Sequence, residues 1–317
     1  MVKFGFKKGF QRYQCRVCKR TQSDIPENPL GNLRVPFEKA AQVVALLCEG
    51  TGIRASERLT GLNRRTVLGI LQTAGQKAVD LMEEKVLNLQ LEQVQADELV
   101  CFVKTKQVNT LPDDDQHGSF FNFLSVDRAS KLIINWHIGK RTHADFELFL
   151  TELRNRVQGR FQLSTDAYGG YAGKRGAVRQ VFGNTIDYGT EKKYFEKFNG
   201  INSLVPYAFR PKQVVCATRK RQIGNPDMSQ VTTSHTERTN LSVRIFTRRF
   251  TRCTLGYSKT LENLKYALAL FVAHFNFCRV HSAHKMTPAN AAKLTDHNWT
   301  VEELLNWKSD NQPATAP

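Results

Sequence analysis

The chain has 317 residues, of which 41% are hydrophobic, enough for one sizeable core and one or two small modules. Its formal charge of +17 exceeds what solubility requires and favours a polyanionic partner, most commonly nucleic acid. No run of about 18 apolar residues occurs, and no apolar segment follows the first lysines, so we expect neither a membrane partner nor a secretory leader. The odd number of cysteines, seven, argues against a disulfide framework and predicts a cytoplasmic protein.

The positive charge is concentrated in two stretches. Residues 1–20 carry seven basic side chains and no acidic one, and residues 205–260 carry eleven basic and two acidic ones. Together they hold +16 of the +17, so the rest of the chain is nearly neutral. Because a generic solvated surface would spread its charge, the sequence predicts two separate zones that contact an anionic partner.

Residues 1–25 contain a cysteine pair in a basic, aromatic segment. Two residues separate Cys15 from Cys18, a spacing that lets two thiolates bind one Zn²⁺. A structural zinc site needs four ligands, however, and no second Cys or His pair lies within the first 47 residues. The segment has the form of the back half of a zinc ribbon, and zinc binding by this chain alone stays open.

Residues 35–76 show three short helical patterns. They cover about residues 37–48, 53–59 and 64–72, with a glycine-containing turn at 61–63. Two helices joined by such a turn form a helix-turn-helix, whose second helix enters the DNA major groove by its N-terminal residues. Arg64 and Arg65 lie at that N-terminus, so we predict that they contact DNA. The alternative is a plain three-helix packing unit.

The periodicity changes from helical to strand-like at residue 93. Strands are predicted at about 94–103, 120–126, 132–138, 161–165 and 185–188, and helices at about 144–157, 171–181 and 261–278. Three successive strands, then helix, strand, helix and strand, is the order of a ribonuclease-H-like mixed sheet, in which the first and fourth strands are neighbours. We therefore predict an α/β domain of this class, flanked by helices. It covers residues 93–295, between a connecting helix at 77–92 and a C-terminal helix and tail at 296–317.

Three carboxylates that are far apart in the sequence stand where this sheet would bring them together. Asp97 lies on the first predicted strand, Asp166 at the carboxyl end of the fourth, and Glu237 on a later helix. Carboxylates without a His or Cys cage are typical ligands of Mg²⁺. Two such ions, about 3.5–4 Å apart, can promote in-line displacement at a phosphodiester.

The helix that carries Glu237 has one polar and one apolar side. Glu237, Asn240, Arg244 and Arg248 recur at steps of three and four residues and share its polar face. Glu237 also follows Ser234 by three residues, the spacing of a capping box. A purely capping role for Glu237 is therefore the alternative to a catalytic one.

Other side chains compete for these roles. Glu98 points to the opposite face of its strand from Asp97, and periodicity does not decide which of them faces the site. The remaining candidates have simpler explanations: a solvated hairpin tip for Asp113, Asp114 and Asp115, a turn for Asp127, a strand end for Asp187, and structural roles for Cys278, His281 and His284.

Three motifs resemble those of one family of enzymes, the DDE transposases of the bacterial insertion-sequence-one (InsA–InsB) type. The motifs are Gln95-Ala96-Asp97-Glu98-Leu99, Ser164-Thr165-Asp166-Ala167-Tyr168 and His235-Thr236-Glu237-Arg238-Thr239-Asn240-Leu241. Residues 11–18 resemble the end of that family's zinc ribbon, 37–72 its helix-turn-helix, and 247–259 its basic segment. Residues 276–288 resemble the end of integrase-type cores. The front half of the zinc ribbon is missing, which is a departure from the family.

The resemblance implies roles for single residues. Asp97, Asp166 and Glu237 would be the catalytic triad and would bind two Mg²⁺ ions, for which Mn²⁺ could substitute. Asn240 and Arg244 would position DNA or the active site. The DNA-binding residues would further include Arg248, Arg249 and Arg252.

The resemblance also implies a reaction and its partners. The protein would bind the terminal inverted repeats of its element through residues 1–76, free 3′ ends, and join them to target DNA. It would act as a homodimer or larger assembly in a bacterial or archaeal cytoplasm. Two other functions stay open: a non-catalytic DNA-binding repressor of the element, and a nuclease on the same fold.

Overall fold

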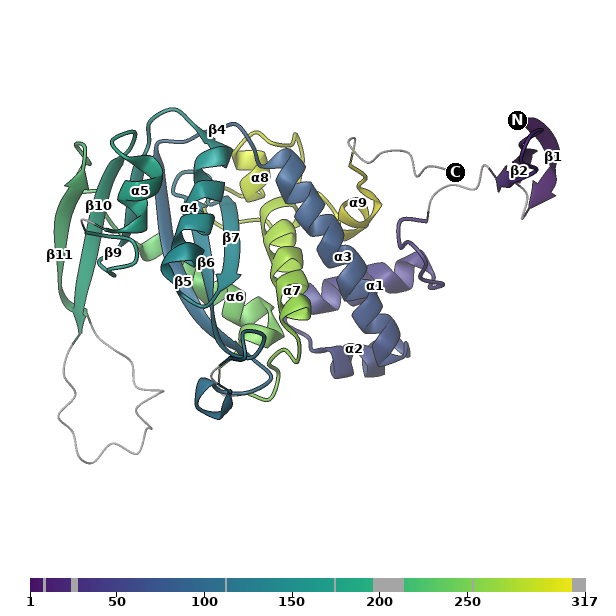
Figure 1. The fold of residues 1–317 in the computed structure, drawn as a ribbon, viewed down its shortest axis with the longest axis horizontal. Coiled ribbons are helices and arrows are strands. Elements are labelled where there is room, and N and C mark those ends of the chain that lie inside the picture. The colour runs from purple at the N-terminus through teal and green to yellow at the C-terminus, as the bar shows by residue number, and fades with distance from the viewer. Residues whose placement is uncertain are drawn as a thin grey trace.

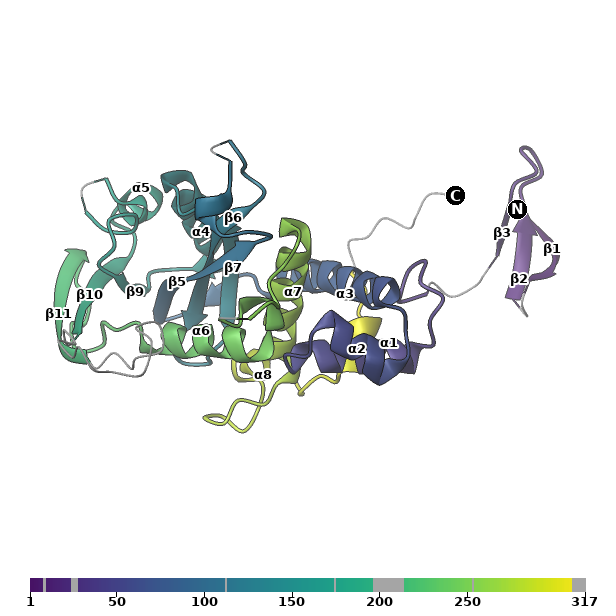
Figure 2. The same ribbon diagram turned by 90° about the horizontal axis from the view of Figure 1, so that it is seen from below.

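The computed structural model describes residues 1–7, 10–23, 28–111, 113–173, 175–195, 214–252 and 254–309 (Figure 1). The predicted tail beyond residue 309 and residues 205–213 of the second basic stretch lie outside the described residues. At the N-terminus, β1 (Val2–Lys7), β2 (Phe10–Gln14) and β3 (Thr21–Ser23) form an antiparallel sheet of three strands. This small sheet lies apart from the rest of the chain in both views (Figures 1 and 2).

Three helices follow: α1 (Phe37–Cys48), α2 (Ile53–Thr60) and α3 (Arg64–Lys85). Gly61 ends α2 in the left-handed conformation, with φ of 72°, which glycine adopts without a steric penalty. The Asn63 side chain then caps α3 by accepting a hydrogen bond from the Arg65 backbone N–H. The predicted turn between the second and third helices is therefore confirmed.

The prediction of two separate helices within residues 64–92 is wrong. α3 runs without a break for 22 residues, past residue 76. Its buried side chains continue at helical spacing from the first half into the second: Val67, Ile70, Leu71, Ala74, Ala78, Leu81 and Met82. Because one apolar stripe covers the whole length, nothing in the packing separates a DNA-reading helix from a connecting helix.

A mixed sheet of six strands forms the centre of the remaining chain. Its strands are β5 (Gln93–Val103), β6 (Gly118–Asp127), β7 (Ile133–Gly139), β9 (Gln162–Asp166), β10 (Asp187–Phe195) and β11 (Val214–Ile223). The strand order is β11-β10-β9-β5-β6-β7. β9 is parallel to β5 and β10, and the other pairs are antiparallel. The mixed α/β class and the predicted neighbourhood of the first and fourth strands, β5 and β9, are thus confirmed.

The helices cover both faces of this sheet. α4 (His143–Arg156) and α5 (Ala177–Phe182) lie on one face, and α6 (Ser234–Phe246) lies on the other (Figure 2). α5 begins directly after Gly176, six residues later than predicted. The predicted long helix is α7 (Leu261–Ala273), continued by a π-helical turn, η4 (His274–Cys278).

The remaining elements are short. They are β4 (Leu89–Gln90), β8 (Val157–Gln158), η1 (Gln107–Asn109), η3 (Arg248–Phe250), α8 (Pro288–Ala291) and α9 (Val301–Asn306). No helix of the described segments combines the length and the apolar character needed to cross a membrane.

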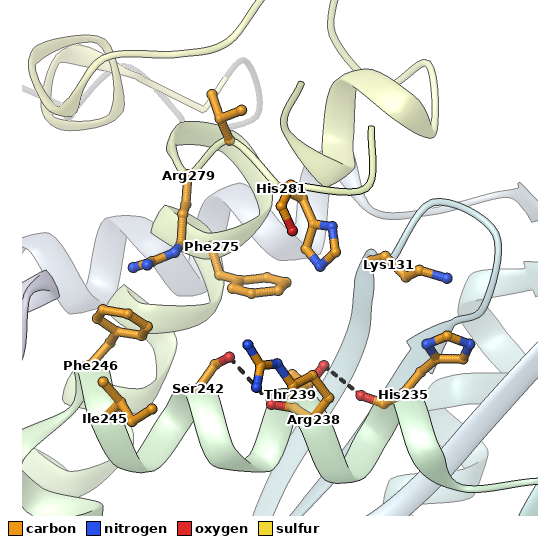
Figure 3. Close-up of a pocket in the computed structure, with 12 residues that line it drawn as sticks. Lys131, His235, Arg238, Thr239, Ser242, Ile245, Phe246, Phe275, Arg279 and His281 are labelled. Atoms are coloured by element: carbon orange, nitrogen blue, oxygen red, sulfur yellow. Dashed lines mark hydrogen bonds between the residues drawn. The ribbon is translucent and has the colours of Figure 1, made fainter. Parts of the chain in front are cut away.

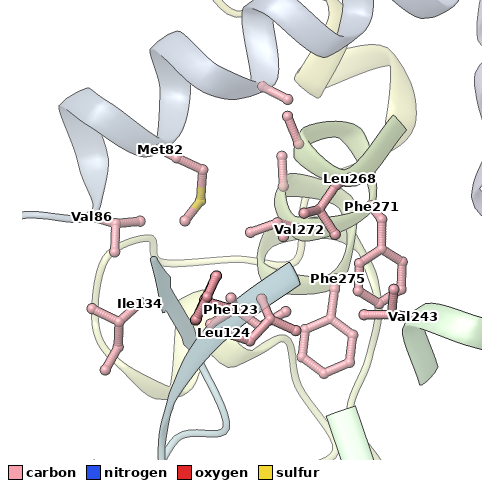
Figure 4. Close-up of a cluster of buried hydrophobic side chains, with 14 of the residues drawn as sticks. Met82, Val86, Phe123, Leu124, Ile134, Val243, Leu268, Phe271, Val272 and Phe275 are labelled. Atoms are coloured by element: carbon pink, nitrogen blue, oxygen red, sulfur yellow. The ribbon is translucent and has the colours of Figure 1, made fainter. Parts of the chain in front are cut away.

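One continuous core joins α3, α7, α6 and the sheet. Met82 of α3, Leu124 of β6, Val243 of α6 and Phe271 of α7 all belong to it, and all are 3% exposed or less. Figure 4 shows these side chains meeting between the helices and the strands. Since burial of each such side chain contributes roughly 1.5–3 kcal/mol, this core holds α6 firmly against the sheet.

Candidate active site

Asp97 and Asp166 lie on adjacent parallel strands. The parallel register pairs Gln95 of β5 with Ser164 of β9. Two residues further on, Asp97 and Asp166 occupy the next positions on the same face of the sheet, because side chains alternate along a strand. Asp166 is the last residue of β9, at the carboxyl end of that strand. The two motif acids therefore share one edge of the sheet.

Helix α6 crosses that same face and is attached to β5 by hydrogen bonds. The Gln95 side-chain oxygen accepts the backbone N–H of His235 at 2.9 Å. One and a half turns later, the Asn240 amide donates to Asp97 Oδ2, also at 2.9 Å. Asn240 is 6% exposed, so its amide is directed into the protein. This contact favours the positioning role of Asn240 over a direct contact with DNA.

The carboxylates carry excess negative charge. Burial, together with Glu98, Asp166 and Glu237, raises the pKa of Asp97 to about 7. Burial and Glu237 also raise the pKa of Asp166, although the Tyr168 backbone N–H and Arg141 act against this shift. The three motif acids are thus near enough to interact electrostatically, although their positions in the sequence are far apart.

Glu237 is held by groups other than the two aspartates. Its carboxylate pairs with the Lys193 ammonium and accepts a hydrogen bond from the Thr233 hydroxyl at 2.7 Å. Lys193 also lies 3.5 Å from the Glu191 carboxylate. The capping-box alternative for Glu237 is wrong, because Thr233, not Ser234, precedes the helix and its side chain accepts no backbone N–H of α6.

The donor chemistry of the site fits a hard divalent cation, but the three acids are not gathered into one ligand set. Carboxylate oxygens are the ligands that Mg²⁺ prefers, and a cation would neutralise the charge that raises the pKa of Asp97. Within the described residues, no three His, Cys, Asp or Glu side chains are arranged to hold a metal ion. Glu237 would join Asp97 and Asp166 only after its carboxylate separates from Lys193.

Arg141 is a residue of this region that the sequence analysis missed. Its guanidinium donates to the buried Glu98 carboxylate, at 2.8 Å from Nε, and lies 3.7 Å above the Tyr168 ring. The Tyr168 backbone N–H in turn donates to Asp166 Oδ1 at 3.0 Å. Glu98 therefore faces Arg141 and Asp97 faces α6, which answers the question that periodicity left open. No spacing in the sequence links Arg141 to Glu98, since they lie 43 residues apart.

The predicted DNA-binding arginines fall into two groups. Arg64, Arg65, Arg248 and Arg252 have exposed side chains, at the start of α3 and after the end of α6. Burial instead lowers the pKa values of Arg244 and Arg249 to about 10. Arg249 also donates to the Ser258 hydroxyl at 2.8 Å, so it serves the fold.

The competing acids have structural partners. Asp127 accepts the backbone N–H of Ser130 at 2.7 Å, which confirms its turn role. Asp187 pairs with Arg160 at 2.6 Å at the first residue of β10, the end of the sheet away from the carboxylates. Asp114 pairs with His117 at 2.6 Å in the loop before β6.

Cys15 and Cys18 lie at the turn between β2 and β3. Hydrogen bonds from the backbone N–H groups of Cys18 and Val17 lower the pKa of the Cys15 thiol, which favours the thiolate that a metal needs. No third Cys or His joins them in the part of the chain that the structure describes. In the C-terminal region, the Cys278 thiol contacts the Thr300 carbonyl oxygen at 3.5 Å.

Comparison with known proteins assigns no family to this chain. No protein-family model matches the chain, and no curated protein matches it. Among solved structures, it is similar to a chain of the simian T-cell lymphotropic virus intasome in complex with PP2A regulatory subunit B56 gamma. The TM-score is 0.32, the identity is 16%, and the match covers 88% of this chain and 76% of that chain. A likeness this weak establishes neither the fold nor the function.

Proposed function

We propose that the protein is a DDE transposase, a Mg²⁺-dependent polynucleotidyl transferase with a ribonuclease-H-like catalytic domain. The strand order supports this fold. β5 and β9 are parallel neighbours, and on their other sides β5 has an antiparallel partner and β9 has a parallel one. The motif resemblance supports membership of the insertion-sequence-one family.

The observation that carries the proposal is the placement of Asp97 and Asp166 on adjacent parallel strands, on the face of the sheet to which α6, the helix of Glu237, is attached. These acids come from two strands and a helix, and their mutual repulsion contributes to the raised pKa values of Asp97 and Asp166. A purely structural arrangement would avoid such repulsion, because clustered and partly buried carboxylates destabilise a fold. A cation-binding role accounts for it.

In this proposal each residue has a defined task. Asp97 and Asp166 would bind Mg²⁺, and Asn240 would hold the Asp97 carboxylate in one orientation. Lys193 would neutralise Glu237 until a metal ion and DNA arrive. Bound Mg²⁺ would activate the attacking oxygen and stabilise the leaving oxygen of the phosphodiester.

DNA recognition would be divided between the N-terminal region and the segment after α6. Arg64 and Arg65 would contact the terminal inverted repeats, and Arg248 and Arg252 would contact DNA phosphates. Because two ends of an element must be joined to one target, the acting form would be at least a homodimer. Zn²⁺ on Cys15 and Cys18 would require further ligands from outside the described residues.

The test is cleavage and joining of DNA that carries the flanks of this gene, with and without Mg²⁺ or Mn²⁺. We expect Asp97→Asn, Asp166→Asn and Glu237→Gln to reduce cleavage at least about 100-fold, since each removes a ligand charge. DNA binding should persist in all three. Asp115→Asn is the matched control, because Asp115 is an exposed acid in the loop before β6.

The outcomes separate the three functions. Undiminished cleavage by the triad variants would overturn the assignment of the site. Binding of end-containing DNA without cutting or joining would instead identify a repressor. Cutting that is never followed by joining, and that ignores the ends, would identify a nuclease.

A further inference from the structure

Helix α6 borders a cavity on the side turned away from the carboxylates. The cavity has a volume of about 330 Å³ (Figure 3). His235, Arg238 and Ser242 of α6 form one wall, and Phe275 and His281 form the other, with Lys131 from the turn between β6 and β7. In Figure 3 the His281 ring and the Phe275 ring point from η4 and the following loop towards α6.

The cavity and the candidate active site occupy different faces of one helix. His235, Arg238 and Ser242 follow each other at steps of three and four residues, which places them on one stripe. Glu237 and Asn240 belong to a different stripe, and Asn240 contacts Asp97 across the other face. The cavity therefore has no direct part in the proposed chemistry at Asp97.

The lining of the cavity is basic. It includes Lys131, His235, Arg238, Arg279 and His281, and no Asp or Glu. Of these, Arg279 stacks on Phe246 at 3.5 Å and lies 3.7 Å from Glu49. Lys131, Arg238 and His281 form no ion pair within the described residues. The Lys131 ammonium donates to the Arg128 backbone carbonyl oxygen, which is uncharged, so the positive charges of Lys131 and Arg238 are not neutralised by these contacts.

Burial is the main cause that lowers the pKa of His281, and the nearby His284 and Lys131 lower it further. Neighbouring cations make each further proton unfavourable. A bound anion would reverse this effect, so the cavity is suited to negative charge.

We propose that this cavity binds the phosphate group of a nucleotide, either a free mononucleotide or one nucleotide of a single DNA strand. Arg238 and Lys131 would contact the phosphate oxygens, because guanidinium and ammonium groups form strong charge-assisted hydrogen bonds with phosphate. Ile245 and Phe275 provide an apolar wall for the nucleoside part. A volume of about 330 Å³ is at the lower end of the range for small-molecule sites and exceeds what an inorganic anion needs.

The test measures binding in EDTA, so that it does not depend on the catalytic acids. Four probes are used: inorganic phosphate, thymidine monophosphate, a 5′-phosphorylated hexanucleotide, and its unphosphorylated counterpart. We expect Arg238→Gln and Lys131→Gln each to weaken binding of the phosphorylated probes about tenfold, since each removes one charge-assisted contact. Lys265→Gln is the control, because Lys265 is exposed on α7 and its substitution removes the same charge outside the cavity.

A second measurement locates the ligand. In an NMR titration of protein with isotope-labelled histidine, binding should raise the pKa of His281, while the exposed His143 of α4 serves as the reference. Circular dichroism of each variant shows whether it is folded. Tighter binding of the hexanucleotide assigns the cavity to a DNA strand, and tighter binding of the mononucleotide assigns it to a free nucleotide.

Three results would overturn the proposal. One is that Lys265→Gln weakens binding of the phosphorylated probes as much as the cavity variants do, which would show general charge attraction. Another is the absence of any change at His281 on saturation with the probes. The third is an equal affinity for inorganic phosphate and for either phosphorylated nucleotide probe. Such equality would exclude a role for the nucleoside part.

Discussion

Three side chains near the candidate active site stabilise carboxylates that are shielded from water. Asp97 depends on the Asn240 amide, Glu98 on the Arg141 guanidinium, and Glu237 on the Lys193 ammonium. The Arg141 and Lys193 cations neutralise Glu98 and Glu237, whereas the uncharged Asn240 amide only donates a hydrogen bond to Asp97. The site therefore combines local stability with an overall excess of negative charge next to Asp97.

We predict that Arg141→Gln destabilises the protein by about 2–4 kcal/mol at pH 7, because it leaves the Glu98 carboxylate buried without a cation. The Glu98 side chain is 4% exposed in the ion pair. The double variant with Glu98→Gln should recover at least half of the loss. Urea unfolding of the two single variants and the double variant measures this coupling, and equal stability of Arg141→Gln and the double variant would contradict it.

His274 predicts a pH dependence of stability. Burial, with Arg279 as the second cause, lowers the pKa of His274 from 6.5 to about 4. Between these values the unfolded chain binds a proton that the folded chain does not, so stability falls as the pH decreases. The loss attributable to His274 is about 3 kcal/mol when complete.

We expect His274→Gln to remove most of this loss. The measurement compares the free energy of unfolding of the wild type and the variant at pH 7 and pH 4.5. An equal loss of stability in the wild type and the variant over this range would show that His274 is protonated in the folded state.

At the scale of elements, the contact between α3 and α7 attaches the helical unit to the sheet. Gly75 of α3 lies directly against α7: a Cβ at this position would be 2.5 Å from the Tyr266 Cβ and 2.8 Å from its backbone Cα. Backbone atoms cannot move away without shifting a helix. The close approach of the two helices therefore requires glycine at residue 75.

We predict that Gly75→Ala destabilises the protein by about 1–3 kcal/mol, because overpacking outweighs the roughly 1 kcal/mol that alanine gains in a helix. Gly69→Ala in the same helix is the control. A Cβ there would meet only the flexible Leu33 side chain, at 3.1 Å. This variant should be neutral or slightly stabilised. Thermal unfolding measures both, and a stabilised Gly75→Ala protein would contradict the packing argument.

Helix α6 is the element around which both proposals are arranged. Its packing is visible in the sequence as a polar stripe and an apolar stripe. The structure confirms the helix from Ser234 to Phe246, although it ends before Arg248, which the polar stripe had included. A third stripe, containing His235, Arg238 and Ser242, borders the basic cavity. This stripe was not predictable from the sequence, because the opposite wall comes from residues 275–282, which no local pattern connects to α6.

At the scale of the whole molecule, the charge of +17 predicts strongly salt-dependent DNA binding. If six to ten phosphates are contacted, affinity should fall by roughly 10³–10⁵ between about 50 and 200 mM salt, because bound counterions are released. Fluorescence anisotropy of labelled DNA at several salt concentrations measures this slope. An affinity that hardly changes with salt would contradict the assignment of the basic segments to DNA.

The predictions from sequence were most accurate where the signal is local. The alternation of apolar and polar residues correctly predicted β5, β6, β7 and β9, and the first and fourth strands are neighbours as expected. Errors occurred where packing overrides local signals. α3 continues through residue 76 because α7 covers it, and β11 was missed although β10 pairs with it along most of its length.

The sequence by itself determined the order of most elements and the three motif acids on two strands and a helix. Periodicity and turn residues act over a few positions, and that range is sufficient to predict a strand or a helix. The tertiary structure alone decided which charges meet: Lys193 with Glu237, Arg141 with Glu98, and Lys131 with Arg238 and His281 around one cavity. These partners are brought together by the packing of α6 and the sheet, and contacts of that range leave no periodic trace in the chain.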